Sequence, residues 1–221
     1  MNLPPFPGTG FWWVLLAVAL YGLLHSFLAS HTAKRLAARI FGAALTQRYY
    51  RLFFALQAGL TFLPALALAW RLPDRRLWAI PMPWLAVTML VQGLAVLGLL
   101  AGVAQTGAGR FVGLEQALDP DSANRPPQLV ASGFYRWVRH PLYLFGILLI
   151  WLLPVMSANL LALNLGVTAY LVLGTIPEER KLRQELGPPY EAYRRRTPWL
   201  VPWPRRRDLP TDYAESTELE K

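Results

Sequence analysis

The stretch GFYRWVRHPLYLFGILLIWLLP, residues 133–154, sets charged side chains directly against an apolar segment. Arg139 and His140 run into Pro141 with no spacer, and Arg136 precedes them by one helical turn. Proline suits the first turn of a helix, where its missing N–H has no partner to lose. The free N–H groups of a helix start favour an anion. We therefore expect an anion-binding site at this helix start, with the two cations beside it.

Two adjacent carboxylates, Glu178 and Glu179, end the uncharged run that begins at Pro141. The run is interrupted by Pro154 and by the polar turn at residues 157–159, a pattern that indicates a helical hairpin. Because a hairpin brings its two ends together, the carboxylates are expected to lie beside the cations. A site with an anion-binding half and a cation-binding half suits a zwitterion such as an amino acid moiety.

The residue inventory argues against several other chemistries. Cysteine is absent, which excludes disulfides, thiolate metal sites and cysteine nucleophiles. The histidines His25, His31 and His140 lack metal-binding spacing, so no metal is expected. The net charge of +9 needs no nucleic acid, since membrane topology and anionic lipids account for it. His25 remains a weaker candidate, because polar groups inside a membrane often mark function.

The elements that position these residues are predicted to be membrane helices. Apolar residues make up 54% of the chain and charged residues 16%, outside the norm for soluble proteins. Charge-free windows of about 20 residues are long enough to cross a bilayer. They predict three spans and a hairpin that supplies a fourth and a fifth, at residues 11–30, 52–70, 84–105 and 141–176. The hairpin arms are short, so we expect them to be embedded among neighbouring helices.

Orientation follows from the uneven distribution of basic residues. Of the 22 Lys and Arg, 19 fall in alternate segments on one side of the membrane and 3, all in residues 71–83, on the other. The positive-inside rule then places the N-terminus outside and the C-terminus in the cytoplasm. The predicted fold class is an all-α integral membrane bundle with five transmembrane helices.

The chain divides into four expected regions. Residues 1–106 form a three-helix membrane region and residues 107–140 a cytoplasmic loop. Residues 141–204 form the hairpin and a cytoplasmic segment, which together are expected to be the functional core. The end of the chain, residues 205–221, has the composition of a disordered tail.

Two segments in the last third of the chain carry a family resemblance. They are SGFYRWVRHPLYLFG and, after the hairpin, EERKLRQELGPPYEAYRRRTPWLVP. Together they resemble the isoprenylcysteine carboxyl methyltransferase and phospholipid methyltransferase superfamily, over roughly residues 130–202. The stretches LHSFLASHTAKR and FVGLEQAL are more similar to small bacterial members, including methanethiol S-methyltransferases and NnrU-type proteins.

The resemblance implies an enzyme of the bacterial cytoplasmic membrane that holds S-adenosylmethionine at the cytoplasmic end of the hairpin. It implies catalytic roles for Arg139, Glu178 and Glu179. Leu186 and Thr197 depart from the residues common in the family without changing a polar position. Carried over position by position, the implied cofactor-binding residues are Gly133, Tyr135, Val138, Arg139, His140, Pro141, Tyr143, Gly146, Glu178, Glu179, Tyr190 and Tyr193.

The implied chemistry is transfer of a methyl group from a sulfonium. It needs positioning and a water-poor pocket and no nucleophilic side chain. The carboxylates can balance the cofactor ammonium group, and aromatic faces such as Tyr143 can favour the sulfonium. The acceptor stays open between an isoprenylcysteine-like carboxylate, a small thiol, a phospholipid amine or another lipophile. The rival functions are a non-enzymatic NnrU-like membrane protein and a transporter, the latter disfavoured because the polar residues avoid the membrane midplane.

The two adjacent glutamates cannot serve one ligand equally, because neighbours on a helix point about 100° apart. Glu178 shares its face with Gly174, which leaves room for a ligand. Glu179 is expected to pair locally with Arg183 at i, i+4. We therefore predict that Glu178 faces the cofactor and that Glu179 supports it, provided that the helix continues past Pro177.

Overall fold

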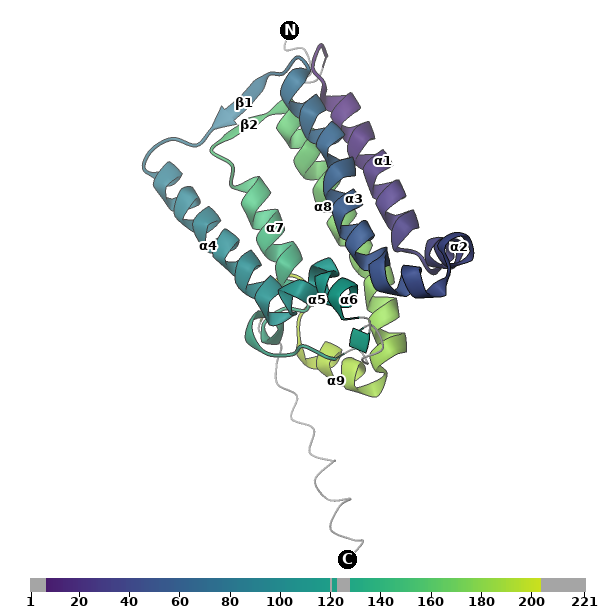
Figure 1. The fold of residues 1–221 in the computed structure, drawn as a ribbon. Coiled ribbons are helices and arrows are strands. Elements are labelled where there is room, and N and C mark those ends of the chain that lie inside the picture. Colours follow the sequence, from purple (N-terminus) through teal and green to yellow (C-terminus); the bar gives the residue numbers. More distant parts are fainter. Residues whose placement is uncertain (1–6, 120, 123–127, 204–221) are drawn as a thin grey trace, which may run out of the picture.

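The structure, a computed structural model, describes residues 7–119, 121–122 and 128–203, so the predicted disordered tail lies outside the described residues. Helices dominate it, and the all-α membrane class is confirmed (Figure 1). Four helices are long and apolar enough to cross a membrane, namely α1 (Phe11–Ala29), α3 (Ala43–Arg71), α4 (Trp84–Gln105) and α8 (Ala158–Leu186). The first three correspond to the three spans predicted from the charge-free windows, but α1 ends one residue earlier and α3 begins nine residues earlier than expected.

Helices α1, α3 and α8 pack side by side as one group (Figure 1). Their shared core includes Val14 and Val18 of α1, Ala65 of α3 and Ala162 of α8, all buried. Close contact depends on Gly166, where an added Cβ would lie 2.8 Å from a Val18 methyl group. Most other apolar side chains of these helices face outward, as expected for helices surrounded by lipid.

A second group consists of α4 and α7 (Pro141–Trp151), which pack against each other (Figure 1). Two glycines of α4 make this contact possible. A Cβ on Gly98 would lie 2.6 Å from the ring of Phe145, and a Cβ on Gly102 would lie 2.7 Å from Leu142. Small residues at such positions let membrane helices approach closely.

The first arm of the predicted hairpin, which corresponds to the fourth predicted span, is a helix too short to cross a membrane. Helix α7 has 11 residues, roughly 16 Å of helix, which does not cross a bilayer alone. The chain after Pro154 forms a strand, β2 (Val155–Ser157), that pairs antiparallel with β1 (Arg76–Ala79). The pairing satisfies backbone groups that a helix would otherwise satisfy internally. The hairpin predicted between Pro141 and Glu178 is therefore α7, β2 and α8, with unequal arms.

Helix α8 begins with two capping side chains. Ser157 Oγ accepts from the N–H of Leu160 at 3.2 Å, and Asp74 Oδ1 accepts from the N–H of Asn159 at 3.0 Å. Caps of this kind satisfy N–H groups that have no partner inside the helix. The helix then runs through Pro177 to Leu186 without interruption, as the prediction for the glutamates required.

Short elements gather at the end of the bundle opposite the β1–β2 sheet (Figure 1). Gly187, with φ of +58°, ends α8 in a conformation that suits glycine, and the next helix starts at once with a proline. Arg48 and Arg51 of α3 donate to carbonyl groups of Ala117 and Phe111 and so fix part of the loop. The short elements are α2 (His31–Phe41), α5 (Ala108–Val112), α6 (Leu114–Leu118), η2 (Gly133–Arg136) and α9 (Pro188–Arg196).

Candidate functional site

The segment that follows α9 returns to the start of α7. The N–H of Arg139 donates to the carbonyl of Pro198 at 2.9 Å, and the N–H of His140 donates to that of Trp199 at 3.2 Å. These bonds hold the chain at the point where it enters α7. The two halves of the sequence motif, separated by the whole hairpin, therefore meet at one end of the bundle.

Glu179 is the centre of the polar contacts at this end. Its Oε2 accepts from Nη1 of Arg139 at 2.5 Å. Its Oε1 lies 3.0 Å from Nε2 of His140 and accepts from the hydroxyl of Tyr190 at 3.0 Å. The side chains of Arg139 and Glu179 are only 8% and 12% exposed. Arg139 and His140, just before α7, and Tyr190 of α9 thus satisfy one buried carboxylate of α8, which compensates the cost of removing its charge from water.

Two tyrosines of α9 reinforce this arrangement. Burial, followed by the negative charge of Glu179, holds the pKa of Tyr190 well above its ordinary value, so its hydroxyl stays a donor. Burial also raises the pKa of Tyr193, which donates to the carbonyl of Tyr135 at 2.6 Å. Burial and the charge of Glu178 raise the pKa of Tyr135 to about 12. All three phenols therefore remain protonated at neutral pH.

Glu178 has a different environment from its neighbour. Its side chain is 42% exposed and accepts one hydrogen bond, from Tyr143 at 2.7 Å. Nδ1 of His140 lies 3.7 Å from its Oε2, and the rings of His140 and Tyr143 stack with centroids 5.3 Å apart. A carboxylate can accept about four hydrogen bonds. Glu178 can therefore accept further hydrogen bonds from a ligand, whereas the oxygens of Glu179 already accept from protein donors.

Two sequence-based expectations are wrong in detail. Arg139 and His140 are not unpaired cations beside the helix start, because Glu179 binds one nitrogen of each. Glu179 does not pair with Arg183, whose Nε lies 3.2 Å from Glu191 of α9. Glu179 instead forms several hydrogen bonds to residues far away in the chain, in a buried position. An exposed i, i+4 ion pair with Arg183 would contribute only a few tenths of a kcal/mol.

The other predicted residues have structural surroundings of several kinds. Gly133, with φ of +58°, comes so close to Gln105 that a Cβ would collide with the amide of Gln105. Val138 and Pro141 are buried where the chain enters α7. Gly146 has no atom within 4 Å of the position of a Cβ, so no packing requirement explains this glycine. These four residues have no polar side chain, so they contribute no side-chain hydrogen bond to Glu179.

Sequence reasoning missed three contributors. Gln105 closes α4 onto η2, with its Oε1 accepting from the N–H of Phe134 at 3.1 Å. Trp199 supplies a backbone acceptor, and the TPWLVP segment beside the motif was the available signal. Arg180 follows the glutamates directly and lines a pocket. His25 has no polar contact with these residues among those described; its ring lies 4.5 Å from that of Phe54 and 5.7 Å from that of Tyr170 in α8.

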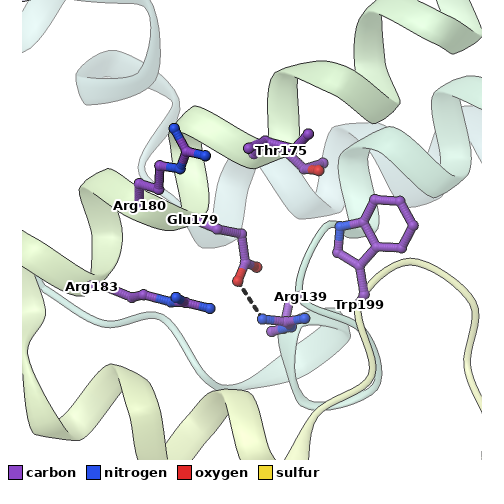
Figure 2. A pocket seen from close by; sticks show the side chains of 7 residues that line it. Arg139, Thr175, Glu179, Arg180, Arg183 and Trp199 are labelled. Atoms are coloured by element: carbon purple, nitrogen blue, oxygen red, sulfur yellow. Dashed lines mark hydrogen bonds and ion pairs between the residues drawn. The ribbon is translucent and has the colours of Figure 1, made fainter.

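Two pockets flank the entry into α7. One of about 320 Å³ has a charged lining made by Arg139, Glu179, Arg180 and Arg183 with Thr175, Ile176 and Trp199 (Figure 2). The other, of about 450 Å³, is mainly apolar and lies between η2, α4 and α7. It includes three of the predicted cofactor-binding residues, Gly133, Val138 and Pro141.

A family model described as a protein of unknown function, DUF1295, matches residues 34–197, which contain the motif at the start of α7, both glutamates and the two tyrosines of α9. The chain belongs to this family. No solved structure matches the chain significantly.

Curated relatives of this DUF1295 protein are methyltransferases by name. It is 34% identical over 196 residues to methanethiol S-methyltransferase 2 of Bradyrhizobium diazoefficiens, covering 85% of this chain and 71% of the relative. It is 30% identical over 200 residues to methanethiol S-methyltransferase 1 of the same organism, covering 86% and 66%. It is 29% identical over 206 residues to the methanethiol S-methyltransferase of Pseudomonas sp. (strain GM41(2012)), covering 88% of this chain and 76% of the relative.

The chain therefore spans between 66% and 76% of the length of these relatives. They confirm the predicted resemblance to a membrane methyltransferase family and the methyltransferase class of enzyme.

Proposed function

We propose that this DUF1295 protein transfers a methyl group from S-adenosylmethionine to a small thiol at the cytoplasmic face of the membrane. The observation that carries the proposal is the convergence of Arg139, His140, Tyr143, Glu178 and Glu179 at one end of the α7–α8 hairpin. The names of the curated relatives support the type of reaction and favour a thiol among the acceptors.

Glu178 is the residue that we assign to the cofactor. Its exposed carboxylate has one protein donor, Tyr143, and can accept further hydrogen bonds from an ammonium group. The N–H groups of Leu142 and Tyr143 precede the first hydrogen bond of α7, from Leu144 to His140 at 3.1 Å. Such helix-start groups suit a carboxylate. The residues present thus fit both charged ends of a bound amino acid moiety.

The remaining residues of the site act by positioning. Glu179 holds Arg139 and His140, and His140 stacks on Tyr143, which donates to Glu178. S-adenosylmethionine, when bound, supplies an electrophilic methyl group, and the reaction then depends on orientation and exclusion of water. Aromatic rings beside the carboxylate favour a cationic sulfonium. No residue of this chain needs to form a covalent intermediate.

We place the site on the cytoplasmic side of the bacterial inner membrane, with the N-terminus outside. The charge distribution of 19 basic residues against 3 supports this orientation. The start of α7 bonds to Trp199 and its continuation, β2, pairs with β1, so this arm links the two opposite ends of the bundle. Helix α7 and the extended segment together would make the fourth of five crossings.

Binding and transfer can be tested with the purified protein in detergent. Titration with S-adenosylhomocysteine, followed by calorimetry, should give saturable binding that Glu178→Gln weakens. Methyl transfer from labelled S-adenosylmethionine should then be compared between methanethiol, a farnesylcysteine analogue and phosphatidylethanolamine. Transfer only to one of the last two would replace the thiol assignment. Absence of S-adenosylhomocysteine binding would favour a non-enzymatic NnrU-like membrane protein.

A further inference from the structure

The charged pocket of Figure 2 lies on a different face of α8 from Glu178. Thr175, Glu179 and Arg183 recur at intervals of four and line it, and Arg180 extends it on one side. Successive residues of a helix point about 100° apart, and Glu178 is not part of this lining. The pocket is therefore not explained by the cofactor residue assigned above.

Two guanidinium groups around this pocket have unused hydrogen-bonding capacity. The side chain of Arg139 is 8% exposed, and its Nε has no hydrogen-bond partner among the described residues. Arg180 forms no hydrogen bond or ion pair with any residue in the part of the chain that the structure describes. Arg183, in contrast, is held by Glu191. A buried polar group without a partner is costly, so the orphaned Nε points to a ligand.

The charges of the lining favour an anion as that ligand. Arg139, Arg180 and Arg183 surround a single carboxylate, Glu179, which already accepts from Arg139 (Figure 2). Guanidinium groups bind phosphate through paired N–H donors and are less strongly hydrated than ammonium groups. A phosphate therefore matches two arginines with free N–H groups, as a carboxylate would, and the position of the pocket distinguishes the two.

The position of the pocket indicates where the phosphate comes from. Ile176 and Trp199, both in the lining, are 48% and 38% exposed, and Val201 and Trp203 nearby are more exposed still. The uncharged run of α8 ends at Pro177, immediately before the pocket. Exposed tryptophans beside the end of an apolar helix are typical of the level of lipid headgroups.

We propose that this pocket binds the phosphate of an anionic phospholipid headgroup. Nε of Arg139 and the guanidinium of Arg180 hold the phosphate, while Ile176 and Trp199 contact the apolar part of the lipid. Nη1 of Arg139 stays on Glu179, so the lipid completes the hydrogen bonding of Arg139 without breaking its ion pair. Binding should therefore stabilise the joint between α7 and α8.

Lipid binding to the purified full chain in detergent tests this proposal. Native mass spectrometry should show saturable binding of phosphatidylglycerol and much weaker binding of phosphatidylcholine. Arg180→Gln should lower the affinity for phosphatidylglycerol about tenfold, the usual scale for a lost charged hydrogen bond. The matched control is Arg39→Gln, which removes an exposed cation of α2. The control should change the affinity less than twofold.

A second measurement covers the stability of the variants. Phosphatidylglycerol should raise the melting temperature of the wild-type protein and of Arg39→Gln, and raise that of Arg180→Gln much less. Equal losses in both variants would show general surface attraction and overturn the proposal. Tight binding of inorganic phosphate alone would overturn the lipid as the source. Displacement of the lipid by S-adenosylhomocysteine would assign the pocket to the cofactor and likewise overturn it.

Discussion

Arg139 and Glu179 are 40 residues apart in the chain and form a buried ion pair that joins the start of α7 to α8. The backbone of Arg139 is held at the same time by the carbonyl groups of Pro198 and Trp199. One residue therefore links the two arms of the hairpin and the segment after α9. Because Glu179 is used in this joint, its neighbour Glu178 is the carboxylate left for a ligand.

The ion pair should matter most for stability. Glu179→Gln leaves the guanidinium of Arg139 buried without its counter-charge, and should lower the free energy of unfolding by about 3 kcal/mol. Glu178→Gln changes a half-exposed carboxylate and should cost less than about 1 kcal/mol. Thermal unfolding in detergent measures both. Equal destabilisation by the two substitutions would contradict the assignment of Glu179 to the joint.

Replacing both Arg139 and Glu179 tests whether the ion pair adds more stability than the burial of its two charges costs. Breaking a buried pair leaves one charge uncompensated, whereas two apolar residues of similar volume can be tolerated. The double variant Arg139→Met with Glu179→Leu should therefore be more stable than Glu179→Gln alone in the same unfolding experiment. A double variant less stable than the single one would indicate that both charges are needed in their own right.

Cofactor affinity should depend more on Glu178 than on Glu179, the reverse of the order expected for stability. Glu178→Gln should weaken S-adenosylhomocysteine binding about tenfold, because it removes one charge-assisted hydrogen bond and leaves the joint intact. Glu179→Gln should change the affinity less, when measured by calorimetry well below its melting temperature. A larger loss in the Glu179 variant would refute the assignment of Glu178 to the cofactor.

The contact between α4 and α7 depends on glycine at one position. Gly98→Ala should destabilise the protein by about 1–3 kcal/mol, because its Cβ would overlap the ring of Phe145. Gly93→Ala in the same helix is the control, since no atom lies within 4 Å of its Cβ position. The control should be neutral or stabilising, given the helix propensity of alanine. Equal melting temperatures for both variants would show that the two helices separate without cost.

Orientation can be measured in a chain that has no cysteine of its own. Single cysteines at Ala108 and Ala192 should be protected from an impermeant thiol reagent in intact cells, whereas one at Ala79 of β1 should react. All three positions are exposed on the structure. Asp74, in the same loop, is unsuitable for a cysteine because its side chain caps α8. Labelling of Ala192→Cys from outside would place the candidate site in the wrong compartment.

The sequence alone determined the class of the protein and the meeting of the two ends of the hairpin. Uncharged windows of bilayer length leave few alternatives to membrane helices, because a charge inside a bilayer is costly. The polar interruption in the run from Pro141 to Pro177 predicts a hairpin, whose two ends lie side by side. The meeting of Arg139 with the glutamates followed from connectivity, and the family resemblance followed from the order of the motif residues.

The tertiary structure decided which side chains bind one another. Helix phase is set by packing against neighbours, so the sequence did not reveal that Glu179 faces Arg139 and that Glu178 faces Tyr143. Helix α7 is short because the chain after it forms β2, which pairs with β1 from a distant part of the chain. The charged pocket likewise needs Trp199 and Arg180, which only the folding of the last segment onto α8 brings together. Such contacts depend on distance and direction in space, which residue types and spacing do not specify.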